Sequence, residues 1–164
     1  MHVAKKERAA EIPRPKISES TVRRLSLYLR LLQEAAAGVI HGSPWGPEFD
    51  NAANKRFMAD FERRHNCIPS EYAAVAYDSA QLIDSALGKV KGNVADKKAF
   101  QAALKAADFP SVRGKFRFNH NQLPIQDFFV FEIGRDASGR YIHKTMAKVL
   151  SDHQDAYHSE CPMK

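Results

Sequence analysis

The feature that most constrains the fold is a change of hydrophobic period near residue 110. Before it, three segments repeat apolar residues at spacings of three and four, as amphipathic helices do. They are "AANKRFMADFERRH" after Asp50 or Asn51, "EYAAVAYDSAQLIDSAL" after Ser70 and "KKAFQAALKAA" after Asp96, each following a capping residue. After it, "KFRF", "DFFVFEIG" and "YIHKTMAKVL" indicate strands, with the turn "RDASGR" between the last two. This order predicts an α/β fold with an antiparallel end.

The same patterns predict which faces are buried. The short apolar piece "GVIHGS", which is bounded by glycines, is expected to be a buried strand, followed by the loop "PWGPEFDN". In the first of the three helices, Ala53, Phe57 and Phe61 share one face. The spacing in the second helix predicts a buried stripe made of Ala73, Ala76, Ala80, Ile83 and Leu87.

The start of the chain differs from the rest in charge. Residues 1–30 hold eight basic and three acidic side chains, and so carry five of the six net positive charges. We expect residues 1–17 to be a flexible basic lead and residues 18–37 to form a basic amphipathic helix. Its apolar positions recur at three and four: Val22, Leu25, Leu29, Leu32 and Ala36. Such a segment is either a solvated tail or a binding site for nucleic acid or another anionic surface.

Motifs for catalysis or cofactor binding are missing from the sequence. It has no G-x-G-x-x-G, P-loop, G-x-S-x-G or H-E-x-x-H pattern. Asp78 and Asp84 stand six positions apart on one predicted helix, which does not suggest an acid–base pair. Cys67 lies near His65 but lacks a third, orienting group. The Asp, His, Glu and Cys residues of the C-terminal tail lack the spacing of a metal site, which favours a solvated tail. We therefore expect no enzymatic activity, no cofactor and no metal.

Two kinds of membrane-related segment are also missing from the sequence. No run of about 18 uncharged apolar residues exists, so no membrane span is predicted. The opening "MHVAKKERAAEIPRPK" has positive charge without the apolar stretch of a secretory signal peptide. As the sequence stands, a cytoplasmic location is expected.

Two aromatic side chains are candidates for ligand binding. Trp45 follows the first predicted strand, and Tyr72 lies near the start of the helix after Ser70. Loops at the ends of such elements form ligand clefts in α/β folds. An amphipathic ring there can stack on a small ligand, or it can pack within its own domain.

Three stretches between Gly38 and Lys164 carry a resemblance to a known family. They are "GVIHGSPWGPEFDNAANKRFMADFERRHNCIPSEYAAVAYDSAQLIDSAL", "AFQAALKAADFPSVRGKFRFNHN" and "DFFVFEI", and the second contains F-x-S-x-R-G-x-F-x-F. Their series resembles the C-terminal part of type I periplasmic solute-binding proteins, the leucine/isoleucine/valine-binding family of ABC importers. The resemblance implies a partial type I periplasmic-binding-protein fold, a three-layer α/β arrangement, which the basic helix precedes.

The resemblance also implies a function and a site. The family's members are bilobed periplasmic receptors that close by a hinge on an amino acid or a related branched or aromatic acid, and deliver it to a membrane permease. By this resemblance Tyr72 would lie beside the ligand and Ser43 and Trp45 at the cleft rim, while Tyr77 and Asp78 would be structural. The family's chain is much longer than the matching part, and the ligand-gripping residues of its N-terminal lobe have no counterpart here. We therefore expect weak or no ligand binding by this chain alone.

A second resemblance is shorter. The stretch "PKISESTVRRLSLYLRLLQEAA", residues 15–36, resembles the first helix of the winged-helix domain of the redox-sensing repressor Rex. No recognition helix, wing or Rossmann domain follows it, so only sequence-independent phosphate contacts by Lys16, Arg23 and Arg24 are implied. Three hypotheses stand: a fragment of an ABC importer's solute receptor, a remnant of a DNA-binding repressor, and a fusion product without function.

Overall fold

The computed structural model describes residues 35–163. The chain divides into two compact units, residues 1–35 and 36–164, and the elements below belong to the second. The basic lead and nearly all of the predicted helix over 18–37 lie outside the described residues. In order, the elements are β1 (Ile40–Ser43), α2 (Ala52–His65), α3 (Glu71–Lys89), α4 (Lys97–Lys105), β2 (Phe116–Phe118), β3 (Pro124–Arg135), β4 (Tyr141–His153) and a short 3-10 helix (His158–Glu160).

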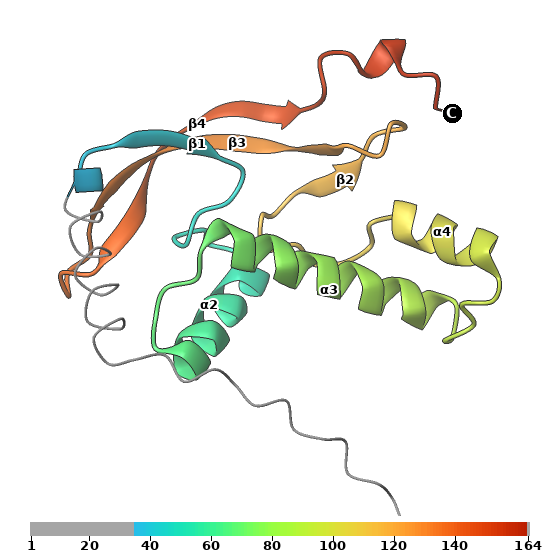
Figure 1. Ribbon diagram of the computed structural model, residues 1–164, viewed down its shortest axis with the longest axis horizontal. Helices are drawn as coiled ribbons and strands as arrows, with labels where there is room; N and C mark the ends of the chain where they lie inside the picture. Colours follow the sequence, from blue (N-terminus) through green and yellow to red (C-terminus); the bar gives the residue numbers. More distant parts are fainter. Residues whose placement is uncertain (1–34, 164) are drawn as a thin grey trace, which may run out of the picture. The chain divides into compact units, whose positions relative to one another are not determined.

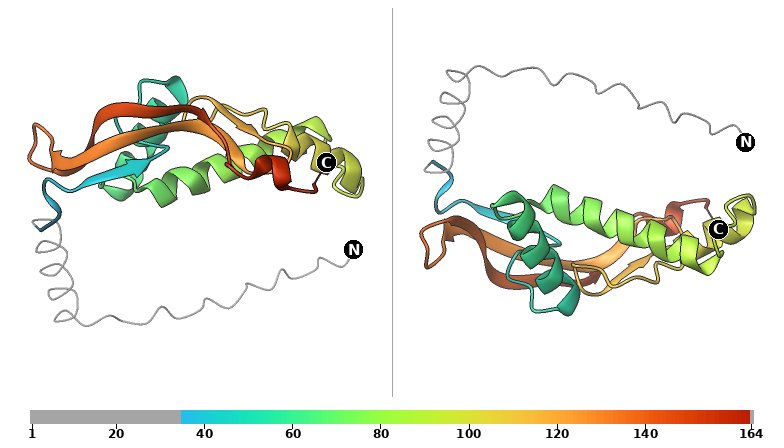
Figure 2. Two further views of the ribbon diagram at one scale, coloured as in Figure 1. Left: turned by 90° about the horizontal axis from the view of Figure 1, so that it is seen from above. Right: turned by 90° about the horizontal axis from the view of Figure 1, so that it is seen from below.

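Strand β3 is the centre of one antiparallel sheet. β4 pairs along one edge of β3, from Arg135 opposite Tyr141 to Gln126 opposite His153. β1 and β2 share the other edge end to end, because β1 pairs with residues 129–132 and β2 with residues 124–126. The three α-helices lie on one side of this sheet (Figure 1, Figure 2). The predicted α/β order with an antiparallel end is confirmed, and the described part consists of one sheet layer and one helix layer.

The helices begin where their capping residues predict. The side-chain oxygens of Asn51, Ser70 and Asp96 accept hydrogen bonds from backbone N–H groups three residues later, at 2.8, 3.4 and 3.0 Å. Each cap satisfies a donor that the first helical turn leaves unpaired. The choice between Asp50 and Asn51 is settled in favour of Asn51.

The turn between β3 and β4 is closed by one carboxylate. Asp136 accepts hydrogen bonds from the Ser138 hydroxyl at 2.7 Å and from the backbone N–H groups of Ser138 and Arg140, both at 2.9 Å. These bonds, the Ser138 hydroxyl first, lower the pKa of Asp136 to about 2. Gly139 takes a φ of +81°, a left-handed conformation that suits glycine. The predicted hairpin turn is therefore confirmed.

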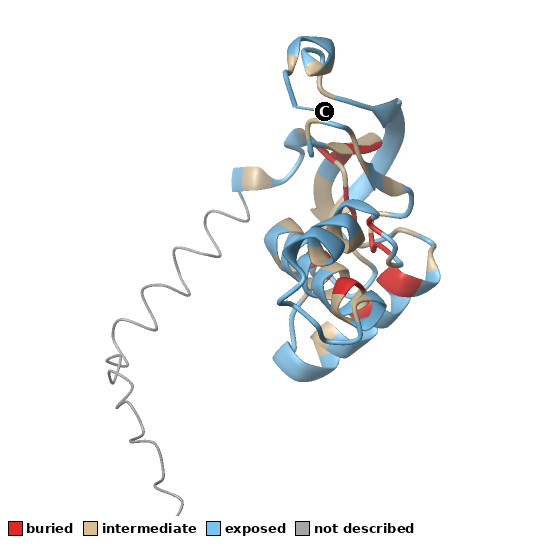
Figure 3. Cartoon of the chain, turned by 90° about the vertical axis from the view of Figure 1, so that its right-hand side faces the viewer, coloured by how far each residue is buried: buried red, intermediate tan, exposed pale blue. Residues whose placement is uncertain are grey.

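The core lies between the sheet and the helices and is small. Figure 3 shows that buried segments are few and that much of the surface is exposed. One apolar cluster consists of Trp45, Ala53, Phe57, Ala74 and Val112. On β3 the fully buried ring of Phe131 stacks on His41 at 5.5 Å between ring centres. The predicted inward face of α2 is confirmed, because Ala53 and Phe57 are buried and Phe61 packs against the cluster.

The predicted buried stripe of α3 is wrong. Ala76, Ala80 and Ile83 are exposed, whereas the buried residues of this helix are Ala74, Asp78 and Ala86. Both sets repeat at helical spacing, so periodicity alone could not choose between them. The face that is buried carries Asp78, whose carboxylate has hydrogen-bond partners inside the protein.

Strand β1 is formed as predicted, but it is not a buried strand. Val39 and Ile40 are 47% and 61% exposed, while Ser43 at the other end is buried. Within residues 35–163 the strand pairs with β3 alone, so its second edge has no partner strand there. Its apolar run therefore lies at the border of the sheet and not in its middle.

The contact between Gly46 and Phe131 yields a prediction about packing. A Cβ at position 46 would lie against Cε1 of the Phe131 ring and 2.8 Å from its Cζ. We expect Gly46→Ala to lower the free energy of unfolding by about 1–3 kcal/mol, because the ring and the loop must shift. Urea denaturation followed by circular dichroism measures this change.

The matched control is Gly88→Ala on α3. Nothing lies within 4 Å of a Cβ at that position. Alanine is the better helix former, so this substitution is expected to raise stability by roughly 0.5–1 kcal/mol. Equal effects of the two substitutions would contradict the packing of Gly46 on Phe131.

Candidate ligand-binding site and its polar network

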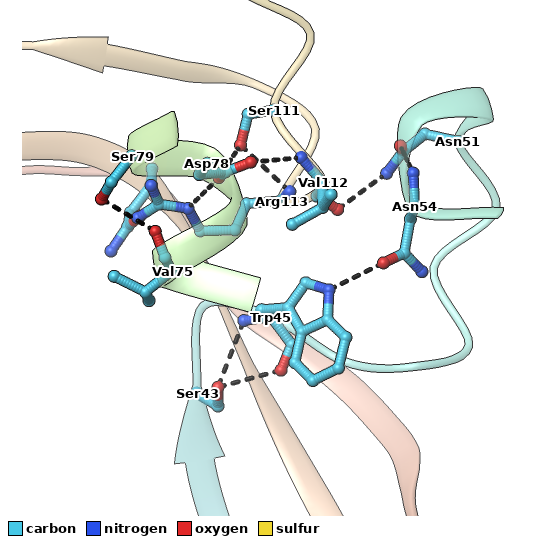
Figure 4. A network of polar contacts seen from close by, with 11 residues as sticks. Ser43, Trp45, Asn51, Asn54, Val75, Asp78, Ser79, Ser111, Val112 and Arg113 are labelled. Atoms are coloured by element: carbon cyan, nitrogen blue, oxygen red, sulfur yellow. Dashed lines mark hydrogen bonds and ion pairs between the residues drawn. The ribbon is translucent and has the colours of Figure 1, made fainter. Parts of the chain in front are cut away.

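The loop after β1 is held by hydrogen bonds that its own side chains make. The Ser43 hydroxyl donates to the carbonyl of Trp45 at 2.9 Å and accepts from the Trp45 backbone N–H at 3.2 Å. The indole Nε1 of Trp45 donates to Oδ1 of Asn54 at 2.8 Å, as Figure 4 shows. These bonds fold the loop back onto α2.

Asn54 and Asn51 extend this network from the start of α2. Asn54 is fully buried, and its Nδ2 donates to the carbonyls of Pro47 and Phe49, both at 3.1 Å. Asn51, the cap of the helix, donates through Nδ2 to the carbonyl of Val112 at 3.0 Å (Figure 4). One helix start therefore fixes two loops that are far apart in the sequence.

The placement of Ser43 and Trp45 differs from the cleft rim that the resemblance implied. They are 1% and 3% exposed, and the Trp45 ring packs edge-on against Phe57 at 6.1 Å between ring centres. The indole N–H and the hydroxyl are both satisfied within the chain. Burial of a large ring is worth more than leaving it in water, so Trp45 serves as core and offers no free face for a ligand.

A buried carboxylate forms the second part of the network. Asp78 on α3 is 1% exposed and accepts three hydrogen bonds from the loop before β2 (Figure 4). The donors are the Ser111 hydroxyl at 2.6 Å, the Val112 backbone N–H at 2.9 Å and Nε of Arg113 at 2.9 Å. A buried charge requires such pairing, since an unpaired one is costly. The prediction that Asp78 is structural agrees with this placement.

Arg113 carries the network on to the sheet. Its Nη1 donates to Oε1 of Gln126 on β3 at 2.8 Å, and its guanidinium lies 4.2 Å from the centre of the Phe116 ring on β2. Helix α3, the loop and two strands are thus joined through one arginine. The network fixes the position of α3 relative to β2 and β3. The charges of Asp78 and Arg113 neutralise each other within it.

Tyr72 has the opposite placement to Trp45. It is the second residue of α3, directly after the Ser70 cap, and its side chain is 87% exposed. Its ring is therefore accessible at the end of a helix whose opposite face is fixed by Asp78. Of the three predicted ligand contacts, only Tyr72 is free to touch a ligand in this structure.

Among the hollows in the described part of the chain are two whose lining does not suit a carboxylate. One of about 430 Å³ lies beside the start of α2, where Glu48, Asp50 and Glu62 outnumber Lys55. Another of about 190 Å³ lies between α3 and β2, where Asp78 already neutralises Arg113. Both are open to solvent, so neither of these two hollows encloses a ligand.

A pair of histidines that the sequence did not single out meets on the sheet. The rings of His41 on β1 and His143 on β4 lie edge to face, 4.6 Å apart between centres. Nε2 of His41 is buried and has no hydrogen-bond partner among the described residues. The pKa of His143 lies below its ordinary value, first because burial disfavours the charged ring and then because of His41, while Glu71 on α3 acts in the opposite direction.

Residues 35–163 hold neither a cluster of metal ligands nor a membrane-spanning helix. No group of three or more potential metal ligands gathers there. Within the same part of the chain, no helix is both long enough and apolar enough to cross a bilayer. Lys16, Arg23 and Arg24 lie outside the described residues, so their contact with nucleic acid stays a prediction.

Comparison with models of protein families identifies the family of this chain. A family model described as periplasmic binding protein matches residues 14–139. The chain belongs to the periplasmic binding protein family. The predicted resemblance to type I solute-binding proteins is thereby confirmed. The match also includes all of residues 15–36, whose likeness to Rex stays a prediction, as does the cellular location. A search of curated proteins finds no match.

Solved structures agree with this membership in the periplasmic binding protein family. An ABC transporter substrate-binding protein from Sphaerobacter thermophilus is 25% identical, with a TM-score of 0.67 over 77% of this chain and 34% of its own. A solute-binding protein of an ABC transporter from R. palustris, solved in complex with benzoate, is 28% identical, with a TM-score of 0.61 over 74% of this chain and 34% of its own. The leucine-binding protein LivK from Thermotoga maritima shares the fold at 18% identity, with a TM-score of 0.58 over 71% of this chain and 32% of its own.

The likeness covers a minor part of each relative. The chain spans about a third of the length of these solved structures. The family is one of substrate-binding proteins, which bind small molecules and do not transform them. What a member binds is therefore set by the site and not by the fold.

The Asp78 network yields a prediction about stability. In Asp78→Asn, the guanidinium of Arg113, whose side chain is 11% exposed, loses its counter-charge. We expect the free energy of unfolding to fall by about 3–5 kcal/mol, the usual cost of breaking a buried pair from one side. Chemical denaturation measures it, with Asp84→Asn on the exposed side of the same helix as control. A loss no larger than that of the control would contradict the assigned role of Asp78.

The histidine pair yields a prediction about pH. Because the pKa of His143 is lowered in the folded state, its contribution to stability is present above the ordinary value of about 6.5 and is lost as the pH falls below it. We expect His143→Gln to lose less thermal stability than the unmodified chain between about pH 7.5 and about pH 5. The exposed His120→Gln is the control. The same pH dependence in all three proteins would argue against a role for this pair.

Proposed function

We propose that this chain forms part of the solute receptor of an ABC importer and contributes one wall of its ligand cleft. The observation that carries the proposal is the family match over residues 14–139. The 28% identical solute-binding protein from R. palustris supports it, since it belongs to an ABC transporter.

The ligand class follows from two relatives and one exposed side chain. The R. palustris protein was solved with benzoate, and LivK from Thermotoga maritima is a leucine-binding protein. We therefore propose amino acids and small aromatic carboxylic acids as ligands. The exposed ring of Tyr72 fits an apolar or aromatic ligand body, because aromatic pairs gain energy beyond the area that they bury.

The proposed mechanism is closure around the ligand without a chemical step. The Asp78 and Arg113 bonds hold α3 against β2 and β3, so the ring of Tyr72 is presented from a fixed helix end. A fixed contact residue reduces the entropy that binding costs. The remaining contacts, and the hinge about which the lobes close, belong to the two thirds of the family fold that this chain does not span.

The proposed partner is the membrane permease of the importer. Receptors of this family deliver their ligand to it, and the described part of this chain has no span of its own. The contact with the permease depends on the proposed function, so evidence against that function is also evidence against this contact.

Ligand binding is tested in a chimera. Residues 38–164 of this chain replace the matching third of the R. palustris benzoate receptor, and calorimetry measures the affinity for benzoate and for leucine. We expect binding of at least one of them by the chimera and little or none by the chain alone. Tyr72→Ala should weaken it about 2–10-fold, equivalent to roughly 0.5–1.5 kcal/mol of aromatic contact.

Tyr157→Ala is the matched control, because Tyr157 is also largely exposed but directly precedes the 3-10 helix His158–Glu160 and is not part of α3. It should leave the affinity unchanged. A folded chimera that binds neither compound would overturn the ligand class. Equal losses in both variants would overturn the role of Tyr72.

A further inference from the structure

Two histidines on different strands of the sheet turn their rings toward each other. His41 lies on β1 and His143 on β4, and these strands pair with opposite edges of β3. Neighbouring strands lie about 4.8 Å apart, so the backbones of β1 and β4 are separated by roughly twice that distance. The centres of the two rings are only 4.6 Å apart, in an edge-to-face arrangement. The two side chains therefore converge over the central strand.

One nitrogen of this pair has no partner. Nε2 of His41 is buried, and no described residue forms a hydrogen bond with it. The ring of His41 stacks on the fully buried ring of Phe131, which holds it in place. A buried polar atom without a partner is rare in a folded protein, and a bound water or ion is one way of satisfying it. In a neutral imidazole that carries its proton on Nδ1, this atom offers a lone pair to a ligand.

The separation of the rings fits two imidazoles that share one metal ion. Zinc binds a histidine nitrogen at about 2.0–2.1 Å, and the centre of the ring lies about 1.2 Å behind that nitrogen. For bond angles between about 90° and the tetrahedral value, two such rings have centres roughly 4.5–5.2 Å apart. The observed 4.6 Å lies in this range. Turning a nitrogen of each ring toward the ion is a rotation about χ2, which is broad in histidine.

We propose that His41 and His143 together bind one divalent transition-metal ion of the zinc, nickel and copper group. Imidazole nitrogen suits these ions, whereas Ca²⁺ and Mg²⁺ prefer oxygen ligands. Among residues 35–163 no group of three or more potential ligands gathers, so water completes the coordination. The site does not depend on the proposed function, because it uses neither Tyr72 nor the ligand cleft.

A water molecule alone is a poorer partner for Nε2 of His41. A buried water makes about three hydrogen bonds to polar groups of the protein. The ring of Phe131 covers one face of His41 and offers no such group. A metal ion needs only the nitrogen lone pairs from the protein and brings its remaining ligands from solvent.

An ion at this place joins the two outer strands across β3. His41 and His143 are about a hundred residues apart in the sequence, so the ion closes a long segment of the chain. Closing such a segment restricts the unfolded chain, and metal binding of this kind contributes directly to the free energy of folding. Strand β1 benefits most, because Val39 and Ile40 are exposed and contribute little apolar burial.

The test is zinc binding by the full chain, produced without a polyhistidine tag and freed of metal with a chelator. We expect calorimetry to show one Zn²⁺ per chain at about pH 7.5, where imidazole is mostly neutral. The thermal midpoint should rise by about 5–10 °C when free zinc exceeds the dissociation constant about a hundredfold. His143→Gln should weaken binding at least tenfold and remove this rise. His153→Gln, at an exposed histidine on the same strand, is the matched control and should change neither quantity.

A second measurement separates the loss of a ligand from a change in the fold. X-ray absorption at the zinc edge counts the imidazoles bound to the ion. We expect two in the unmodified chain and in His153→Gln, and at most one in His41→Gln and in His143→Gln. Circular dichroism of the metal-free variants should show the same secondary structure as the unmodified chain.

Three outcomes overturn the proposal. The first is no zinc binding by the unmodified chain. The second is binding that keeps its affinity in His143→Gln, which indicates an adventitious ion only. The third is a doubling of the mass in light scattering when zinc is added, since the ion then bridges two copies. Each of these results leaves the proposed function as a solute receptor untouched, because that function is tested by the binding of benzoate and leucine.

Discussion

The carboxylate of Asp78 is the interaction on which the described structure depends. It sits on α3 and accepts hydrogen bonds from residues 33 to 35 positions later in the chain. Through Arg113 and Gln126 it connects the helix layer with the central strand. The apolar residues that α3 buries are small, so the helix gains little from hydrophobic burial on that face. Hydrogen bonds buried away from water therefore stabilise the position of α3 where apolar packing is weak, as long as every donor and acceptor has its partner.

Local signals made part of this fold predictable. Asn51, Ser70 and Asp96 mark helix starts because a side chain three residues from a backbone N–H can cap it, whatever lies elsewhere in the chain. The strands after residue 115 follow from alternation and a turn in the same way. The orientation of α3 was not predictable, because its two faces have the same period and the choice is made by Ser111, Val112 and Arg113 in a distant loop. Burial of an acidic residue has no signature in the sequence around it.

The candidate site shows the same division. Residue type suggested both Trp45 and Tyr72, since either ring can stack on a ligand. Only the folded chain separates them, because Asn54 receives the indole N–H and removes Trp45 from the surface, while Tyr72 stays outside. His41 and His143 were missed for a related reason. They are about a hundred residues apart in the sequence, and only the pairing of β1 and β4 with the same strand brings their rings together.

The shared edge of β3 has a consequence for the order in which the chain is made. Among the described residues, β1 and β2 have no strand partner other than β3, and the residues of β3 follow both in the sequence. Ribosomes add roughly 5–20 residues per second. β1 and the three helices therefore leave the exit tunnel seconds before β3, the strand with which β1 pairs. The hairpin of β3 and β4, closed locally by Asp136, can then form quickly and recruit the earlier strands. Until that moment the apolar faces of the helices are open to chaperones and proteases, so the interval between the synthesis of α2 and that of β3 is the vulnerable period for this part of the chain.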